Sequence, residues 1–506
     1  MYVILPFLIH SVLSANILHI ATIGSRSHHI WNRALAIGLT EKGHNVTLLT
    51  HTSEDQKLKN FHIILLEGFF EKGFDGFNLD SLPETDALSG IKLLYDFSRY
   101  SCEHDFQTKG LKTLINYPKD FRFDLIIIDI TLQQCLYPLI DRFNNPPLVA
   151  VTPFLLPPVL AHIFGNPLQT AYMPYYSTKY SDKMTFLERI KNFLLIHAEI
   201  LYKRYIGTPT ELNLARKYFG EHIRDFEEIE RNISILISNY DHILGFPLAL
   251  APNIIPAGGL HIAPVKPLPN DLKTIADSAN DGLIVFTLGS YIRSDQLSIT
   301  KRTAILNAFA KLPQTIIWKF ESEIKGLPKN VIVRKWLPQN DLLGHPKAKL
   351  LITHGGGLST QEAMHHGVPV IAIPFFSDQH ANAGKLVKRQ MAKMLTYHEI
   401  TTEKLYSAIT EILGNPIYSK NIKELSLRYK DQPEKPLKKA VYWVEYVLRH
   451  GGVTNLSLAS RDMSIFEATS YDVVLVVLLG LYLLYSLTLF VFTCIRFTYR
   501  TLSGRT

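Results

Sequence analysis

Residues 16–50 read NILHIATIGSRSHHIWNRALAIGLTEKGHNVTLLT, with an apolar run on either side of a helical pattern. The first run predicts a strand that ends at Gly24-Ser25. After Gly43, a typical helix-ending glycine, VTLLT predicts a second strand. A chain that returns to the same sheet within about 35 residues forms a βαβ unit. We therefore expect a parallel sheet covered by helices in the first part of the chain.

Residues 281–320 repeat this plan. GLIVFTLGS predicts a strand that ends at Gly289-Ser290, and TIIWKF predicts the next strand after a helical pattern. Near-continuous apolar runs recur in FDLIIID (123–129) and PVIAIP (369–374), as is typical of parallel strands buried on both faces. Two such starts predict two doubly wound α/β domains.

A proline-rich stretch, residues 251–271, separates the two halves and is typical of a hinge or linker. The expected domains are therefore 16–250 and 272–415.

The chain has 506 residues, 47% of them hydrophobic and 19% charged, which excludes a disordered or fibrous protein. A net charge of +8, without a dense basic patch, does not indicate nucleic-acid binding. Three cysteines exclude a disulfide scaffold and a cysteine-rich zinc module.

Both ends of the chain carry apolar segments. Residues 1–15 contain no Asp, Glu, Lys or Arg and end in small residues, which predicts a signal peptide cleaved after Ala15; a first buried strand is the alternative. Residues 473–495 carry no charge and are long enough to cross a bilayer, after a juxtamembrane linker at 451–472. The tail, 496–506, carries only basic charges, which predicts a cytosolic tail and a type I protein with lumenal domains.

The lumenal orientation makes two sequons candidate glycosylation sites, at Asn232 and Asn455. A third sequon, at Asn45, lies in a predicted buried strand and is expected to stay unmodified. Cys102 and Cys135 can pair in an oxidising lumen, but the sequence does not give their distance, so the pairing stays open.

The strongest chemical cluster follows the strand LLIT and reads HGGGLSTQE, residues 354–362. A glycine-rich turn that leads into a helix lets the free N–H groups of the first helical turn approach an anion such as a diphosphate. His354 can donate to a phosphate oxygen, and Glu362 can accept from sugar hydroxyls. The cluster matches neither the Walker loop nor the GxGxxG motif, so its sequence does not indicate a dinucleotide-binding site.

Two further groups of polar residues lie near strand ends. Asp378 and Gln379 follow PVIAIP, and a carboxylate beside an amide suits a ligand rich in hydroxyl groups. Trp336 and Gln339 lie in a loop upstream, where an indole face can stack on a flat base. Taken singly, each also fits a plainer structural role as a core tryptophan, a cap or a turn.

The whole stretch 336–379, WLPQNDLLGHP…LLITHGGGLSTQEAMHHGVPVIAIPFFSDQ, closely resembles the donor-binding signature of the UDP-glycosyltransferase family, especially its invertebrate branch. The resemblance extends over nearly the whole chain. It implies a GT-B fold, in which two Rossmann-like domains face a cleft and the last helices, 416–450, return to the first domain.

The resemblance also implies roles around the donor. Trp336 would stack on uracil, Gln339 would lie near the base or ribose, and Glu362 would bind the ribose hydroxyls. Asp378 and Gln379 would hold the sugar.

The diphosphate would be held by Ser290, by His354 and by the main chain after it, including Gly356 and Ser359. Many family members, notably those of plants, carry Asn where this chain has Leu358, so a side-chain contact at that position is in doubt here. Main-chain N–H groups and Ser359 can serve instead.

The first domain should carry the acceptor chemistry. His28 stands fifteen residues before Gly43, which is the spacing the family shows for its catalytic histidine, and a neutral imidazole is a suitable general base near pH 7. Asp129, at the end of its strand, would orient His28, as the family's aspartate does. His29 is the alternative base and Asp124 the less favoured partner, and helix capping is the plainer role for either histidine.

The resulting prediction is an inverting UDP-glycosyltransferase that moves a hexose, with glucose favoured, to a hydroxyl of a small lipophilic acceptor. No cofactor or metal is expected, because no HExxH or CxxC pattern is present and the UDP-sugar is a co-substrate. The expected location is the endoplasmic reticulum membrane, with both catalytic domains in the lumen. The sugar, the natural acceptor and any homo-oligomer stay open.

Residues 154–180 are aromatic and apolar and can line an acceptor pocket or rest against a bilayer; ordinary core and loop packing is the alternative. Basic residues surround an apolar helical stripe downstream, and these can touch an anionic membrane surface or form a solvated face: Lys183, Arg189, Lys191, Lys203 and Arg204.

Two other functions compete with the enzyme: a non-catalytic membrane-anchored binder on the same fold and an NAD-linked oxidoreductase, the latter disfavoured by the missing GxGxxG.

Overall fold

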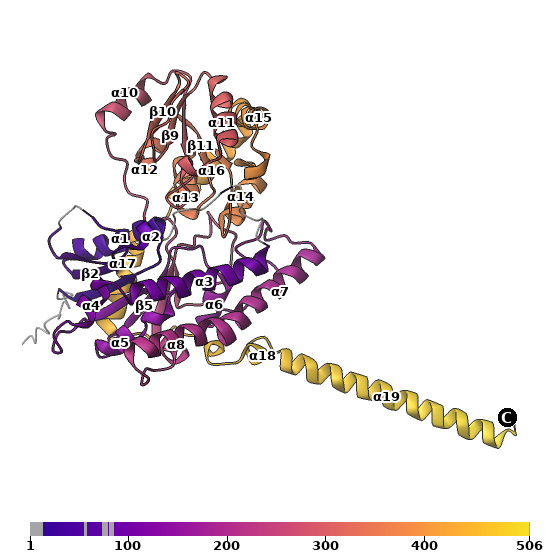
Figure 1. Ribbon diagram of the computed structural model, residues 1–506. Helices are drawn as coiled ribbons and strands as arrows, with labels where there is room; N and C mark the ends of the chain where they lie inside the picture. Colours follow the sequence, from indigo (N-terminus) through magenta and orange to yellow (C-terminus); the bar gives the residue numbers. More distant parts are fainter. Residues whose placement is uncertain (1–13, 55–57, 73–78, 80–85, 505–506) are drawn as a thin grey trace, which may run out of the picture.

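A computed structural model describes residues 14–504 except 55–57, 73–78 and 80–85. Two parallel sheets form the cores of two domains that lie one above the other in Figure 1. The predicted signal peptide, apart from its last two residues, lies outside the described residues. The GT-B arrangement expected from the sequence, with two Rossmann-like domains, is confirmed.

The first sheet has seven parallel strands in the order β3-β2-β1-β4-β5-β6-β7. Its strands are β1 (Asn16–Ala21), β2 (Asn45–Thr50), β3 (Phe61–Leu65), β4 (Leu125–Asp129), β5 (Leu148–Thr152), β6 (Ile233–Ser238) and β7 (Ile254–Pro256). Its helices are α1 (Arg26–Glu41), α2 (Phe69–Lys72), α3 (Ala87–Asp105), α4 (Lys109–Ile115), α5 (Pro138–Arg142), α6 (Pro158–Ile163), α7 (Phe186–Tyr202), α8 (Thr208–Phe219) and α9 (Phe226–Arg231).

The second sheet has six parallel strands in the order β10-β9-β8-β11-β12-β13. Its strands are β8 (Leu283–Thr287), β9 (Thr315–Lys319), β10 (Val331–Arg334), β11 (Ala348–Thr353), β12 (Val370–Ala372) and β13 (Ala392–Met394). Around it lie α10 (Asn270–Ser278), α11 (Ile299–Ala310), α12 (Gln339–Leu343), α13 (Gly357–His366), α14 (Gln379–Lys388), α15 (Thr402–Gly414) and α16 (Pro416–Lys430).

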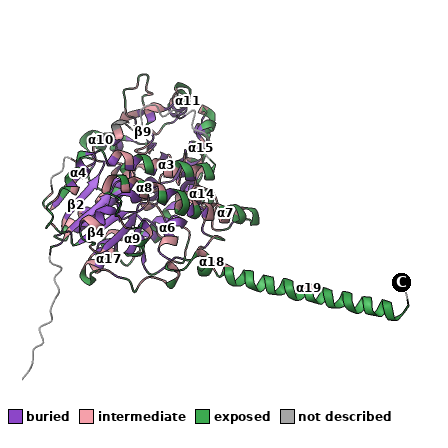
Figure 2. Ribbon diagram, turned by 60° about the horizontal axis from the view of Figure 1, so that its bottom comes forward, coloured by how far each residue is buried: buried purple, intermediate pink, exposed green. Residues whose placement is uncertain are grey.

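Burial explains why these segments are strands. β4, β5, β6 and β8 are buried at every position, because helices cover both faces of each sheet (Figure 2). The apolar side chains of β4, β5 and β6 point alternately to two core clusters, one on each face of the first sheet, and those of β8 point alternately to two further clusters in the second domain. The ends of these buried strands therefore give functional side chains a fixed position.

The segments between and after the two domains differ in detail from the predicted boundaries. Ile254–Pro256, within the predicted hinge 251–271, pairs with β6 as the edge strand of the first sheet. Of the predicted returning helices, α16 stays against the second domain, where Ile422 and Leu425 join its core. The crossing is made by α17 (Pro436–His450), whose Val441 and Val444 join the core of the first domain beside α1.

A long apolar helix, α19 (Tyr471–Leu502), follows the short α18 (Ile465–Ala468) and extends away from both domains (Figure 1). It has 32 residues with a mean hydropathy of 2.5 in its most apolar window, and none of that window is buried (Figure 2). By length and composition, it is a candidate membrane span.

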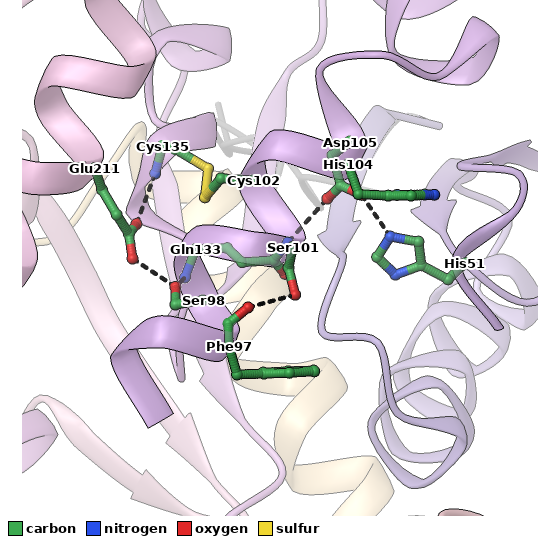
Figure 3. The surroundings of a disulfide bond; sticks show 10 residues. All are labelled: His51, Phe97, Ser98, Ser101, Cys102, His104, Asp105, Gln133, Cys135 and Glu211. Atoms are coloured by element: carbon green, nitrogen blue, oxygen red, sulfur yellow. Dashed lines mark hydrogen bonds and ion pairs between the residues drawn. A yellow bond between two sulfur atoms is a disulfide. The ribbon is translucent and has the colours of Figure 1, made fainter. Parts of the chain in front are cut away.

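A disulfide joins Cys102, near the end of α3, to Cys135, in the loop that follows β4 (Figure 3). The pairing that the sequence left open is therefore present in the structure. Beside it, Glu211 accepts hydrogen bonds from the hydroxyl of Ser98 and from the main-chain N–H of Cys135. The bond and this carboxylate tie the loop after Asp129 to two helices.

Close to the disulfide, the side chains of His51, His104 and Gln133 converge on the buried Asp105 (Figure 3). His51 Nε2 lies 2.6 Å and His104 Nδ1 3.1 Å from the same Asp105 oxygen, while the Gln133 amide donates to the other at 2.9 Å. These short contacts describe a hydrogen-bonded network around one buried carboxylate.

Candidate active site

A cavity of about 670 Å³ lies between the two domains, at the carboxyl ends of both sheets. This is where open α/β sheets bind their ligands. All but one of the predicted catalytic and donor-binding residues line it: His28, Ser290, Trp336, Gln339, His354, Gly356, Ser359, Glu362, Asp378 and Gln379. The exception, Asp129, contacts His28 from behind.

His28 lies in the first turn of α1, and Asp129 is the last residue of β4. Because β1 and β4 are neighbours in the sheet, the start of α1 lies over the end of β4. His28 Nδ1 is 2.9 Å from Asp129 Oδ2, and both residues are buried. The structure thus brings together two side chains that are 101 residues apart in sequence.

Two neighbouring residues, Asn32 and Thr131, hold this pair. Asn32, one turn after His28, donates to Asp129 Oδ2 at 3.0 Å and to the His28 carbonyl at 2.9 Å. The hydroxyl and main-chain N–H of Thr131 donate to Asp129 Oδ1. Burial alone would raise the pKa of Asp129, but the charge of His28 and these hydrogen bonds outweigh it, so its pKa is lowered. The carboxylate is therefore ionised beside the imidazole.

His29 and Asp124, the alternatives weighed from the sequence, lie elsewhere. His29 turns away from the cavity and bonds Thr50 Oγ1 and Glu54 Oε1, each at 2.9 Å. Asp124 stands just before β4, at its opposite end, where it accepts the main-chain N–H of Asn16 at 2.8 Å. Only His28 of the tandem pair reaches both the cavity and Asp129.

In the second domain, His354 follows β11 and packs between two glycines. A Cβ placed on Gly289 would lie 2.4 Å from the His354 ring, and one on Gly356 would lie 2.4 Å from Nε2. Gly289 also has a φ of +85°, which favours glycine. Burial lowers the pKa of His354 to about 4, so the imidazole is neutral at pH 7 and has one N–H to donate.

The helix α13 starts at Gly357 with Gly356 as its N-cap, and no side chain caps it. Its first N–H groups and its dipole face the cavity, an arrangement that favours a bound anion. Ser359, in the first turn of this helix, and Ser290, after β8, add hydroxyl groups to the cavity wall. The arrangement can hold a diphosphate through main-chain donors.

Beside this anion site, Gln339 donates its amide to Glu362 at 2.6 Å and to the Ser359 hydroxyl at 3.2 Å. Burial raises the pKa of Glu362 to about 7, against the lowering effect of Gln339. The indole of Trp336 is half exposed, with Lys319 Nζ at 5.7 Å and the Arg26 guanidinium at 5.9 Å from the ring centroid. A flat base and a diol fit these groups.

Asp378 and Gln379 lie at the start of α14 but differ in which of their side-chain atoms already have hydrogen-bond partners within the protein. Asp378 Oδ2 accepts from Asn382 at 2.8 Å, and burial raises its pKa; the charge of His28 acts on it across the cavity. The Gln379 side-chain oxygen accepts the main-chain N–H groups of Phe375 and Phe376 at 2.8 and 3.2 Å. That oxygen therefore holds its own loop, and only the amide N–H₂ of Gln379 is left for a ligand.

Some residues of the site carry no sequence signal of their own. Asn32, Thr131 and Asn382 look like ordinary helix and turn residues, although each contacts a predicted functional carboxylate. Leu358, at the position where many relatives have Asn, lines the cavity and packs against the apolar core of the first domain. Its side chain therefore joins the two domains.

The sequon residues Asn232 and Asn455 are both exposed. Asn45, at the start of β2, is half-buried, and its amide donates to the Asn16 side chain at 2.9 Å. Glycosylation at Asn232 and Asn455 stays a prediction.

Comparisons with known proteins identify the family of this chain. The family described as "UDP-glucoronosyl and UDP-glucosyl transferase" matches residues 26–506. A "UDP-glycosyltransferase UGT5" of Dactylopius coccus is 33% identical, covering 94% of this chain and 90% of its own. A "UDP-glucosyltransferase 2" of the same insect is 34% identical, covering 91% and 89%. A solved structure, the glycosyltransferase VinC in complex with DTDP, has a TM-score of 0.59 at 16% identity, covering 86% of this chain and 100% of its own.

The structural likeness supports the two-domain fold, and the family match extends over nearly the whole chain, including both halves of the cavity. The chain therefore belongs to the UDP-glucuronosyl and UDP-glucosyl transferase family and is a UDP-glycosyltransferase.

Proposed function

We propose that this protein transfers a hexose, preferably glucose, from a UDP-sugar to a hydroxyl of a small lipophilic acceptor, with inversion at the anomeric carbon. The observation that carries the proposal is that the His28–Asp129 pair and the start of α13 face one cavity from opposite domains. Glucose is favoured because a relative 34% identical is named a glucosyltransferase.

In the proposed reaction, His28 is the general base. With Nδ1–H donated to Asp129, its Nε2 is left unprotonated and takes the proton of the acceptor hydroxyl. The acceptor oxygen bonds to the anomeric carbon while the bond from that carbon to the β-phosphate oxygen breaks. The electron pair of that bond leaves with UDP.

The second domain would stabilise this leaving group. Main-chain N–H groups at the start of α13 and the neutral His354 meet the charge that develops on the diphosphate. Trp336 would stack on uracil, Gln339 and Glu362 would hold the ribose, Ser290 and Ser359 the phosphates, and Asp378 and Gln379 the sugar. We propose that no metal takes part, since hydrogen bonds from this set of donors can stabilise the charge on the leaving group.

The acceptor would occupy the first-domain side of the cavity. Apolar and aromatic residues of α3 and of the loop after β5 line that side, among them Leu93, Leu94, Phe97 and Phe154. The ring of Phe154 packs edge-on against His28, with centroids 5.3 Å apart. An acceptor with a flat, lipophilic body would bring its hydroxyl to the imidazole there.

The helix α19 and the disulfide also bear on where the protein lies in the cell. The apolar helix α19 would anchor the protein in the endoplasmic reticulum membrane as a single-pass type I protein, with both domains in the lumen. The disulfide fits an oxidising compartment, because such bonds persist there and are rare in the cytosol.

The test is incubation of the full-length protein with UDP-glucose and UDP-glucuronate, each with a panel of phenols, followed by mass spectrometry and NMR of the products. We expect a hexoside with inverted anomeric configuration, formed faster from UDP-glucose. UDP binding without any product would favour the alternative, a non-catalytic binder on the same fold. A retained configuration would contradict the single-displacement mechanism.

A further inference from the structure

The helix α7 exposes an apolar face on the outside of the first domain, in addition to the side that packs on the core. Exposed apolar side chains form one outward face of α7 and of the π-helical turn that follows it (Lys203–Gly207). We call this face the α7 stripe: Phe186, Leu187, Ile190, Leu194, Leu201 and, in the π-helical turn, Tyr205. Each of these side chains is between 41% and 69% exposed. A helix of a soluble domain normally buries such a face and exposes its polar one.

The inward face of α7 carries the buried polar residues Asn192 and Glu199 beside Ile196 and Ile200, which join the core. The Asn192 amide donates to the carbonyls of Thr170 and Met173 at 2.8 and 2.9 Å, and its oxygen accepts the main-chain N–H of Tyr175 at 2.6 Å. Glu199 is also buried and accepts from the Tyr176 hydroxyl at 3.1 Å. These bonds fix the rotation of the helix, so the α7 stripe cannot turn inward without leaving Asn192 and Glu199 unpaired.

The α7 stripe lies beside the base of α19. Tyr471, the first residue of α19, has its ring 6.4 Å from the rings of Phe193 and His197 on α7. Phe466 of α18 is 53% exposed and packs against the same tyrosine. The exposed apolar surface of α7 is therefore continuous with the point where the candidate membrane span begins.

Basic side chains surround the α7 stripe. Lys183, Arg189, Lys191 and Arg204 are all exposed. The guanidinium groups of Arg189 and Arg204 lie 5.8 Å from the rings of Phe186 and Tyr205. Of the acidic groups nearby, Glu188 is held by the hydroxyl of Thr185 in a capping box, and Glu227 pairs with Arg204. An apolar helix face bordered by cations is typical of helices that lie in a membrane interface.

We propose that the α7 stripe docks on the surface of the phospholipid bilayer that α19 crosses, so that the first domain is held to the membrane at a second place. This inference rests on the proposed membrane anchor and is independent of the sugar transferred. Docking would bury a contiguous apolar surface that a soluble monomer rarely exposes. On the other side of α7, Tyr176 lines the substrate cavity, so one helix separates the cavity wall from the bilayer.

The test uses the full chain with an environment-sensitive nitrobenzoxadiazole dye on single cysteines. In a Cys494→Ser background, Leu194→Cys and Leu201→Cys place the dye on the α7 stripe. Leu427→Cys is the matched control, because Leu427 is a 70% exposed leucine on α16 of the second domain. The native Cys494, labelled in the wild type, reports insertion of α19. The protein is reconstituted in phosphatidylcholine and phosphatidylserine vesicles with and without doxyl lipids, and circular dichroism checks folding.

We expect the dye at residues 194 and 201 to be blue-shifted and quenched by doxyl lipids several-fold more than at 427. If the dye at Cys494 were quenched, but the dye at residues 194 and 201 were quenched no more than the dye at residue 427, the docking would be overturned and the anchor would stay. A blue shift without lipid quenching would identify a protein partner, such as a second copy, and would also overturn it. No quenching at Cys494 would remove the anchor and the docking together, whatever the transferase activity.

Discussion

In the first sheet β1 and β4 are neighbours; the helix after β1 carries His28, and Asp129 is the last residue of β4. In the second sheet β8 and β11 are neighbours, and the chain after them carries Gly289 and His354. The two positions are topologically equivalent, since strand order reverses at both. The first is built from side chains that bond one another, whereas the second is built from main chain, glycines and one imidazole.

This difference separates two kinds of chemistry. In the proposed reaction, a proton is moved by a side chain whose tautomer must be fixed, and the hydrogen bonds around Asp129 would fix it. In the same proposal, a diphosphate is held by main-chain N–H groups that it must approach closely, and the absence of a Cβ at Gly289 and Gly356 leaves room for this approach and for His354. Substitutions should therefore affect turnover at the first position and donor affinity at the second.

The largest effect in this series is expected for Asp129→Asn. An amide cannot hold His28 in the same tautomer or stabilise the imidazolium, so kcat should fall by about a hundredfold to a thousandfold. The KM for the UDP-sugar should stay unchanged, because Asp129 does not line the cavity. Asp124→Asn, at the other end of the strand, is the matched control and should retain full turnover. Equal losses in the two variants would show that the carboxylate only stabilises the fold.

A smaller effect is expected at the second position for Gly356→Ala. The φ of Gly356 is −61°, so alanine adds no backbone strain, but its Cβ would lie 2.4 Å from His354 Nε2 and displace the ring. Losing a hydrogen bond to a charged phosphate costs about 1.5–3 kcal/mol, which corresponds to about tenfold to a hundredfold weaker binding of UDP by calorimetry.

The control for that experiment is Gly414→Ala, because a Cβ on Gly414 would meet no atom of the described residues within 4 Å. UDP binding by this variant should equal that of the wild type. If Gly356→Ala also bound UDP as the wild type does, His354 and the start of α13 would not form the diphosphate site.

The smallest effect concerns pH at Glu362. Burial raises its pKa to about 7, so the neutral form is favoured in the folded protein; this contribution to stability is present below the ordinary pKa and lost as pH rises through about 7. The ionised form accepts from ribose hydroxyls, so affinity for UDP-glucose should increase by about tenfold from about pH 6 to about pH 8. Glu362→Gln should remove this slope. A slope that survives in that variant would assign the titration to another group, although not to His354, whose pKa is about 4.

Much of the architecture could be predicted because strand ends have a local signal. Apolar runs that stop at glycine or at a polar residue marked β1, β4, β8 and β11, and the cavity forms where those runs end. The edge strand Ile254–Pro256 could not be predicted, because three residues containing a proline look like part of a linker. The crossing by α17 alone depends on packing against α1, which no local pattern encodes.

The site shows the same division. Trp336, His354 and Glu362 could be found from a contiguous signature, but the roles of Asn32 and Thr131 arise from contacts across the fold. The pairing of Cys102 with Cys135 could not be settled, because their separation of 33 residues in sequence says nothing about distance in space. The position of Gln379 next to Asp378 at a strand end could be read from the sequence, but only the structure shows that its side-chain oxygen holds its own loop.

The central claim is that His28 is the base facing the diphosphate site across the cavity. Its most direct test compares product formation from UDP-glucose and a phenol by wild type, His28→Ala and His29→Ala at saturating substrates. We predict that His28→Ala loses about a thousandfold or more in turnover while still binding UDP, and that His29→Ala, whose ring points to Glu54, stays within a few-fold of wild type. Equal turnover by His28→Ala and wild type would contradict the claim.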